Sequence, residues 1–208
     1  MAALIKAAAA ADYPAEIVLV VSNRADALGL ERAKAAGIAT VVIESKPFGK
    51  DRTAFEAALQ RVLDQHRIEL ICLGGFMRLF TAAFAQSWYG RMLNIHPSLL
   101  PSFPGLDPQG QAMRAGVKIS GATVHFVIAK TDAGPILMQG AVAVSDYDSA
   151  ETLSERILEV EHRIYPDALR LLATGAVRLE GEICKTPDSA GSGNFLISPV
   201  ASADGTSV

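Results

Sequence analysis

An amide and an imidazole lie two residues apart in the segment LNIHPSLLPSFPG, residues 93–105. Asn94 and His96 end an apolar run, and the prolines that follow restrict the backbone of the next loop. Side chains two residues apart on a strand leave it on the same face. An amide and an imidazole side by side make a suitable pair for stabilising a developing oxyanion. A buried histidine in a turn, without a chemical role, is an equally open interpretation of the spacing.

Alternating strand and helix patterns place this pair at the end of a strand. Apolar runs typical of buried strands occupy 16–21, 39–44, 68–75 and 91–95, and helical spacing occupies 26–36, 51–67 and 78–88. Such alternation predicts an α/β fold with a mostly parallel sheet. In sheets of this kind, active sites lie just beyond the carboxyl ends of the strands.

The second half of the chain has a different pattern. The runs 121–129 and 135–144 are separated by only five residues, which is too short for a parallel crossover and predicts an antiparallel pair. Asp148 and Glu151 resemble a capping box at the start of a long helix that ends near Thr174. Pro166 should kink or break that helix.

Composition limits the class of protein. The chain has 208 residues, half of them apolar, which suits one globular domain. A formal net charge of -3 without a basic stripe argues against a nucleic-acid partner, and the apolar runs are too short to span a membrane. Cys72 and Cys184 are the only cysteines, so we expect a reduced, cytoplasmic protein without a zinc site. The Ser- and Gly-rich residues 181–208 predict a disordered tail.

The segment NIHPSLLP followed by PG resembles the signature of the folate-dependent formyltransferases, in the form found in glycinamide ribonucleotide formyltransferases. The resemblance extends to about Leu179 and includes SNRADALGLERAKAAGI, GGFMRLF, TDAGPIL and EHRIYP. It implies a Rossmann-like formyltransferase domain at 1–180. It also implies transfer of the formyl group of 10-formyltetrahydrofolate to the amine of N1-(5-phosphoribosyl)glycinamide in de novo purine biosynthesis. The implied enzyme is a monomer or homodimer that acts on small molecules without a metal.

The resemblance also assigns roles to single residues. Asn94 would donate a hydrogen bond to the formyl oxygen, and a protonated His96 would stabilise the oxyanion and act as acid. Asp132 would favour the protonated ring of His96 and hold a water that relays the proton, although an aspartate in this Gly-containing turn needs no function by itself. Thr123 would support the site by hydrogen bonding, and we expect His125 to be structural. The folate contacts implied are Arg52, Met77, Arg78, Leu79, Phe80, Asn94, Ile128, Ala129, Lys130, Thr131 and Asp132. The nucleotide contacts implied are Leu158, Glu159, Val160 and Glu161, with Glu161 on the ribose hydroxyls.

Two departures from the family pattern stand out. Met1 matches the residue just after the family's first strand and its Gly-x-Gly-Ser-Asn phosphate loop, so we expect a fold without that strand and weak nucleotide binding. Asp107 and Gln109 stand where many members carry histidines. Two alternatives remain open: a 10-formyltetrahydrofolate hydrolase, which passes the formyl group to water, and a catalytically impaired folate-binding fragment.

Overall fold

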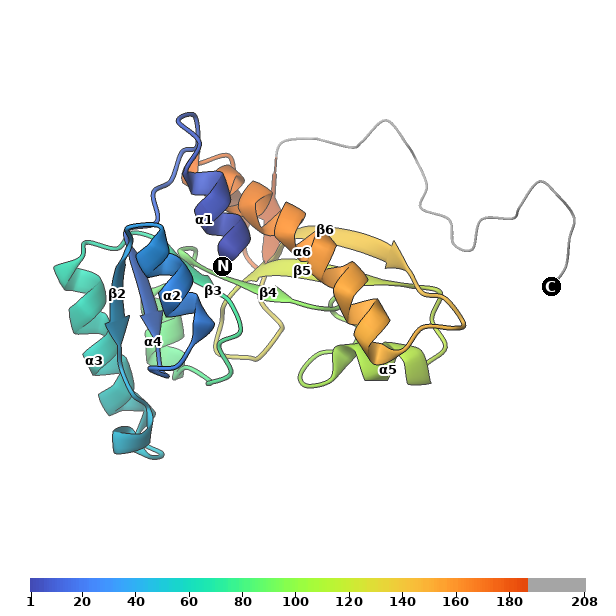
Figure 1. The fold of residues 1–208 in the computed structure, drawn as a ribbon, viewed down its shortest axis with the longest axis horizontal. Coiled ribbons are helices and arrows are strands. Elements are labelled where there is room, and N and C mark those ends of the chain that lie inside the picture. The colour runs from blue at the N-terminus through green and yellow to red at the C-terminus, as the bar shows by residue number, and fades with distance from the viewer. Residues whose placement is uncertain (187–208) are drawn as a thin grey trace, which may run out of the picture.

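The computed structural model describes residues 1–186 as helices and strands that alternate in the first half of the chain (Figure 1). The helices are α1 (Ala2–Ala8), α2 (Leu28–Ala35), the 3-10 turn η1 (Lys46–Phe48), α3 (Arg52–Gln65), α4 (Ala82–Ser87), α5 (Pro108–Arg114) and α6 (Ala150–Ala173). The strands are β1 (Leu19–Ser22), β2 (Ala39–Val42), β3 (Ile71–Leu73), β4 (Met92–His96), β5 (Ile119–Phe126), β6 (Ile136–Ala143), β7 (Arg178–Glu180) and β8 (Ile183–Lys185). Each strand and helix predicted from the sequence has a counterpart, with ends shifted by a few residues.

The strands form three separate sheets within the described residues. One sheet is the parallel pair β1–β2, and a second has the order β3-β4-β5-β6. In the second sheet only β3 and β4 run parallel, while β4–β5 and β5–β6 are antiparallel. The prediction of an antiparallel pair in the second half is therefore confirmed. The prediction of a mostly parallel sheet is wrong for the described strands, because the antiparallel arrangement also includes β4 and because β7 and β8 form a further antiparallel pair.

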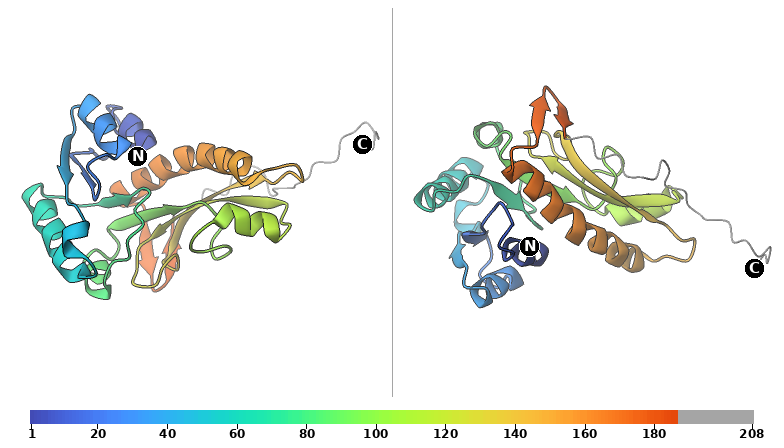
Figure 2. Two further views of the ribbon diagram at one scale, coloured as in Figure 1. Left: turned by 60° about the horizontal axis from the view of Figure 1, so that its bottom comes forward. Right: turned by 90° about the horizontal axis from the view of Figure 1, so that it is seen from above.

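Adjacent residues of β4 face two different hydrophobic clusters, one on each side of the sheet. Met92 packs in a cluster with side chains of α3 and α4, whereas Leu93 packs in a cluster with side chains of α6 and β5. Helix α6 lies along β5 and β6, and α3 and α4 lie at the other end of the molecule (Figures 1 and 2). By alternation, Asn94 and His96 share the Met92 face. The α3–α4 side of the sheet is therefore the side on which the candidate site is built.

Helix α6 differs from its predicted form in two ways. The capping box is made by Ser149 and Thr152 rather than by Asp148 and Glu151. Pro166 lies inside the helix without ending it, because the residues around it are buried against the sheet and their packing outweighs one lost backbone hydrogen bond. The neighbouring Tyr165 donates from its hydroxyl to the Leu73 carbonyl at 2.7 Å, which fixes the helix over the end of β3.

The folded part of the chain continues past residue 180. Arg178–Glu180 and Ile183–Lys185 form an antiparallel hairpin, so the boundary expected at 180 falls in its turn. Residues 187–208 of the predicted tail lie outside the described residues.

Helix α4 begins later than predicted, at Ala82, because the Thr81 side chain accepts a hydrogen bond from the Phe84 amide and caps the helix. Residues 77–80 thus form a loop between β3 and α4 and do not open a helix.

Candidate active site

Asn94 and His96 lie at the carboxyl end of β4, opposite two side chains of β5. The register pairs Asn94 with His125 and His96 with Thr123. Directly opposed residues of antiparallel strands project their side chains on the same face. Asn94, His96, Thr123 and His125 therefore form a polar patch on a sheet whose other face is covered by apolar side chains.

The ring of His125 is held between a carbonyl and the amide of Asn94. Its Nδ1 lies 3.0 Å from the Phe126 carbonyl oxygen, which can only accept, so Nδ1 carries the hydrogen. Burial lowers the pKa of His125 from its ordinary value and favours the neutral ring. The unprotonated Nε2 then accepts from Nδ2 of Asn94 at 3.2 Å. His125 thereby orients the Asn94 amide and leaves its second N–H free to donate elsewhere.

His96 faces an acceptor oxygen from each of its ring nitrogens. Nε2 lies 3.0 Å from the Phe103 carbonyl oxygen, and Nδ1 lies 3.6 Å from Oδ2 of Asp132. The side chains of His96 and Asp132 are 8% and 9% exposed, so the pair is largely shielded from solvent. Nε2 can donate to the Phe103 carbonyl, and a protonated Nδ1 would face the Asp132 carboxylate at ion-pair distance.

Asp132 joins this patch from the link between β5 and β6. Its backbone has a φ of 51°, in the left-handed region that aspartate tolerates better than most residues. Its Oδ2 accepts from the Gly105 amide at 2.8 Å, which connects the link to the loop after β4. Its Oδ1 lies 3.8 Å from Nε2 of His125. One carboxylate thus faces both histidines and fixes the loop that carries the Phe103 carbonyl.

Thr123 is buried beneath the loop that follows His96. Its Oγ1 donates to the Ser98 carbonyl at 2.7 Å and accepts from the Leu100 amide at 3.0 Å. Gln139 of β6 donates to the same Oγ1 and to the Leu100 carbonyl, each at 2.9 Å. These bonds tie the first residues of the loop to the sheet. Gln139 was not predicted from the sequence, and only its pairing with Thr123 across β5 and β6 could have suggested it.

The loop at 77–80 lies on the same side of the sheet as the patch. It follows β3, whose last residue Leu73 pairs with Asn94, and Phe80 packs in the cluster that contains Met92. Met77 and Leu79 are 74% and 58% exposed, so two apolar side chains of this loop face solvent. Apolar walls beside a few polar groups are typical of small-molecule sites. The loop follows β3, the strand that pairs with β4 at Asn94.

The other predicted contacts do not join the patch by any described hydrogen bond. Arg52 is exposed at the start of α3. Ala129, Lys130 and Thr131 are exposed in the link that leads to Asp132, and Ile128 is half-buried there. On α6, Leu158 and Glu159 are exposed, while Val160 and Glu161 are half-buried. Burial raises the pKa of Glu161, and the positive charge of the Met1 amino group lowers it in part.

Asp107 does not take the place of a histidine beside His96. Its Oδ1 accepts from the Gly110 amide at 3.1 Å, and Oδ2 pairs with Arg114 at 3.2 Å, so it caps α5.

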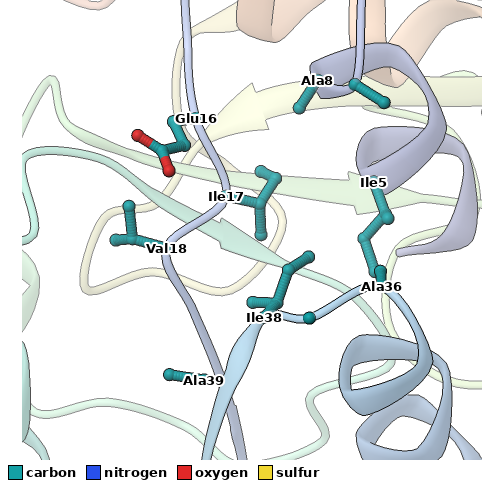
Figure 3. A pocket seen from close by; sticks show the side chains of 10 residues that line it. Ile5, Ala8, Glu16, Ile17, Val18, Ala36, Ile38 and Ala39 are labelled. Carbon is teal, nitrogen blue, oxygen red and sulfur yellow. The ribbon is translucent and has the colours of Figure 1, made fainter.

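A cavity of about 430 Å³ lies away from the patch, between α1 and the residues that precede β1 and β2. Figure 3 shows Ile5, Ile17 and Ile38 around this cavity. None of the predicted site residues lines it.

Two classes of feature are absent from residues 1–186. No helix there combines the length and the apolar character needed to cross a membrane. In the same part of the chain, His, Cys, Asp and Glu side chains do not gather in a group of three or more able to hold a metal ion.

The polar patch at the end of β4 lies within a part of the chain that is similar to known proteins. The family described as formyl transferase matches residues 1–169, which is most of the chain and includes all of the patch. The chain belongs to the formyl transferase family. A phosphoribosylglycinamide formyltransferase of Bacillus subtilis (strain 168) is 42% identical over 161 residues, which are 77% of this chain and 82% of that protein.

The family assignment agrees with a longer relative and with a solved structure. The trifunctional purine biosynthetic protein adenosine-3 of Gallus gallus is 53% identical over 172 residues, 82% of this chain, but the chain spans only 17% of that protein. The crystal structure of glycinamide ribonucleotide transformylase 1 from Symbiobacterium toebii is 45% identical, with a TM-score of 0.86 over 90% of this chain and 88% of that chain. The chain therefore has the α/β formyl transferase fold, with a mixed sheet whose C-terminal strands are antiparallel.

His125 makes contacts that its place in the sequence did not reveal. It was expected to be structural, and its Nε2 accepts from the Asn94 amide and lies 3.8 Å from Oδ1 of Asp132. The signal was present in the alternation of Thr123 and His125, which placed both on one face. What the pattern could not show was that this face lies directly against Asn94 and His96.

Proposed function

We propose that this chain transfers the formyl group of 10-formyltetrahydrofolate to the amine of N1-(5-phosphoribosyl)glycinamide, as a step of de novo purine biosynthesis. One observation carries the proposal: in a member of the formyl transferase family, Asn94, His96 and Asp132 meet on one face of the sheet. An oriented amide donor, a shielded imidazole and a carboxylate are the groups that acyl transfer requires.

The proposed reaction exchanges one carbon–nitrogen bond for another. The amine of the nucleotide attacks the formyl carbon, which forms a new carbon–nitrogen bond and a tetrahedral intermediate with an oxyanion. The bond between this carbon and N10 of the folate then breaks. The proton lost by the amine is taken up at N10, so tetrahydrofolate leaves as a neutral amine.

Each residue of the patch has a separate task in this scheme. The second N–H of Asn94, which His125 leaves free, donates to the oxyanion. A protonated His96 stabilises the same charge and supplies a proton, and the Asp132 carboxylate stabilises the imidazolium. Nε2 of His96 donates to the Phe103 carbonyl in this structure. For Nε2 to contact the substrate, this hydrogen bond must break and be replaced by one to the substrate.

The two substrates would bind at different places near the carboxyl end of β3. The folate would lie against the loop at 77–80 and the link at 128–132, where exposed Met77 and Leu79 offer apolar surface. The nucleotide would lie against 158–161 of α6, with its ribose hydroxyls on Glu161. We propose a single formyltransferase domain that includes the hairpin of β7 and β8, a cytoplasmic location, and a monomer or homodimer. The free thiols of Cys72 and Cys184 support a reducing compartment.

A two-substrate assay tests the proposal. The chain is mixed with 10-formyltetrahydrofolate and the nucleotide amine, and formylated nucleotide and tetrahydrofolate are measured together. We expect the two products in equal amounts, and a loss of about 10²-fold or more in kcat for His96→Ala. His66→Ala is the matched control, because His66 is an exposed histidine at the end of α3.

The same assay separates the alternatives. Tetrahydrofolate released without the nucleotide, and without formylated product, would show a hydrolase instead. Folate binding without either product would show a binding protein. Either result would overturn the proposed transfer.

A further inference from the structure

We infer that Glu56 is a positioning residue for the loop at 76–80 and thereby sets the affinity for the folate substrate. The inference rests on the proposed function, because it takes this loop as the folate wall. Glu56 lies on α3, outside the patch of Asn94, His96, Asp132 and His125, and no step of the proposed reaction uses it.

Glu56 is a buried carboxylate, and both of its oxygens accept hydrogen bonds from the same residue. It is 5% exposed, and its two oxygens accept from the amide and from the hydroxyl of Thr81, each at 2.6 Å. Within the described residues no Lys, Arg or His pairs with it. A buried charge that depends on two short hydrogen bonds is costly to leave without them. Glu56 therefore strongly favours one position of Thr81.

Thr81 is the residue at which the folate wall ends. Its backbone amide follows Phe80 directly, and its hydroxyl also accepts from the Phe84 amide, which begins α4. The bond from Glu56 thus holds the end of the loop at a point where the chain changes from loop to helix. The start of the loop follows β3, which is fixed by its pairing with β4.

Aromatic side chains at both ends of the same loop, and Arg78 in its middle, contact α3 or each other. Phe76 stacks on Phe80 with ring centres 4.9 Å apart, and Phe76 also stacks on Phe55 at 6.5 Å. The guanidinium of Arg78 lies 5.0 Å from the centre of the Phe55 ring. Phe55 and Glu56 are adjacent on α3, so one turn of this helix contacts the loop both through its apolar side chains and through a carboxylate.

This anchoring explains why two apolar residues of the loop are held in solvent. Phe76 and Phe80 stack on each other, while Met77 and Leu79 of the loop that follows β3 remain 74% and 58% exposed. A wall that is already in place before the ligand arrives avoids the entropy cost of ordering it on binding. Loss of the Glu56 bonds should therefore weaken folate binding and leave the reacting groups on β4 unchanged.

Three substitutions on one helix test this role. Glu56→Leu keeps the volume and removes both acceptors, while Glu56→Gln keeps an acceptor for the Thr81 amide and a donor for its hydroxyl. Gln60→Leu is the matched control: Gln60 lies one turn further along α3 and accepts from Nε1 of Trp88 at 2.8 Å, so it ties α3 to the other end of α4. Each variant is measured for the KM of both substrates, for kcat and for hydrogen exchange of the peptide containing 76–81.

For Glu56→Leu we expect the KM of the folate substrate to rise about tenfold, with kcat and the KM of the nucleotide close to wild type. Exchange at 76–81 should be faster in this variant. Glu56→Gln should restore most of the folate KM, and Gln60→Leu should change neither the KM values nor the exchange of 76–81. If Glu56→Leu does not fold, Thr81→Ala removes the hydroxyl bond from the other side and should raise the same KM by a smaller factor.

An unchanged folate KM in Glu56→Leu, or an equal rise in Gln60→Leu, would overturn the inference, because the effect would then be absent or would come from general loosening of α3. A wild-type chain that forms no formylated nucleotide would instead overturn the proposed function. In that case faster exchange of 76–81 in Glu56→Leu, but not in Gln60→Leu, still supports the positioning role. Unchanged exchange would reject it.

Discussion

Nδ1 of His96 lies 3.6 Å from Oδ2 of Asp132, although His96 ends β4 and Asp132 lies in the link between β5 and β6. The carboxylate reaches the ring because it is also held by the Gly105 amide at 2.8 Å. The loop after β4 and the link after β5 are thereby joined at the point where a proton would be stored. If the proposed transfer is correct, the charge of Asp132 rather than its shape is the property that catalysis requires.

The variant Asp132→Asn separates the charge from the shape. Asparagine can still accept from the Gly105 amide, but it cannot stabilise a protonated His96 by charge. We expect kcat to fall by about 10²-fold with little change in either KM, measured by formation of formylated nucleotide. Asp146→Asn removes an exposed carboxylate near Lys118 and should behave as wild type. Wild-type kcat in Asp132→Asn would exclude a role for the charge.

His125 should make the stability of the protein depend on pH. Burial lowers its pKa in the folded state, so below about pH 6.5 the unfolded chain binds more protons than the folded chain. The free energy of unfolding should therefore decrease as the pH falls from about 7 to about 5, which denaturant titration at each pH can measure. In His125→Gln this decrease should be smaller. His66→Gln, which changes an exposed histidine, should keep the wild-type slope. Equal slopes in all three proteins would contradict the assignment.

The ion pair of Asp148 and Arg156 should stabilise the start of α6. Hydrogen bonds from Arg156 hold the pKa of Asp148 well below its usual range, and the Asp148 side chain is only 5% exposed. Since the folded pKa is lowered, the contribution is complete above the unfolded value of about 4 and disappears as the pH falls below it. Arg156→Gln should lower the free energy of unfolding by about 1 kcal/mol at neutral pH, because Arg156 is itself partly exposed.

A second arginine provides the control for this prediction. Arg24 pairs with Asp26 at 2.7 Å, but both side chains are about 70% exposed. Arg24→Gln should therefore leave the free energy of unfolding nearly unchanged. If Arg24→Gln lowers the free energy of unfolding as much as Arg156→Gln does, the burial of Asp148 does not explain the stability that its ion pair contributes. Urea titration of both variants at neutral pH and at about pH 2, well below the unfolded pKa of Asp148, makes the comparison.

Gly140 should tolerate no side chain, because β6 and α6 approach each other closely there. A Cβ added at Gly140 would overlap Cγ1 of Val160 and lie 3.1 Å from Cγ2 of Ile164. We expect Gly140→Ala to lower the free energy of unfolding by about 1–3 kcal/mol, and Val160→Ala to restore part of it in the double variant. Gly29→Ala on α2 meets only the flexible end of Met1 and should be neutral or stabilising by up to about 1 kcal/mol. Equal stability of Gly140→Ala and wild type would disprove the close approach.

Local patterns in the sequence were sufficient for several parts of the fold and the site. A period of two places Asn94 and His96 on one face, and the same period places Thr123 with His125. The short link before Pro135 requires antiparallel neighbours, as β5 and β6 are. These features depend on residues close together in the chain, where strand geometry and chain length restrict the backbone.

Other features depend on contacts between distant segments and could not be read locally. Pro166 ends many helices, yet α6 continues because its buried face packs on the sheet. The loop at 77–80 was predicted to open a helix, but Phe76 and Phe80 stack with α3, and Glu56 holds Thr81 as the cap of α4.

The sequence by itself determined which residues could do chemistry and on which face of a strand they lie. Only the tertiary structure decided that His125 lies against Asn94 and that the Asp132 carboxylate reaches His96. The reason is that side-chain direction follows from local backbone geometry. The meeting of side chains from β4, β5 and a loop depends instead on cross-strand register and on hydrogen bonds between loops, such as that from Gly105 to Asp132.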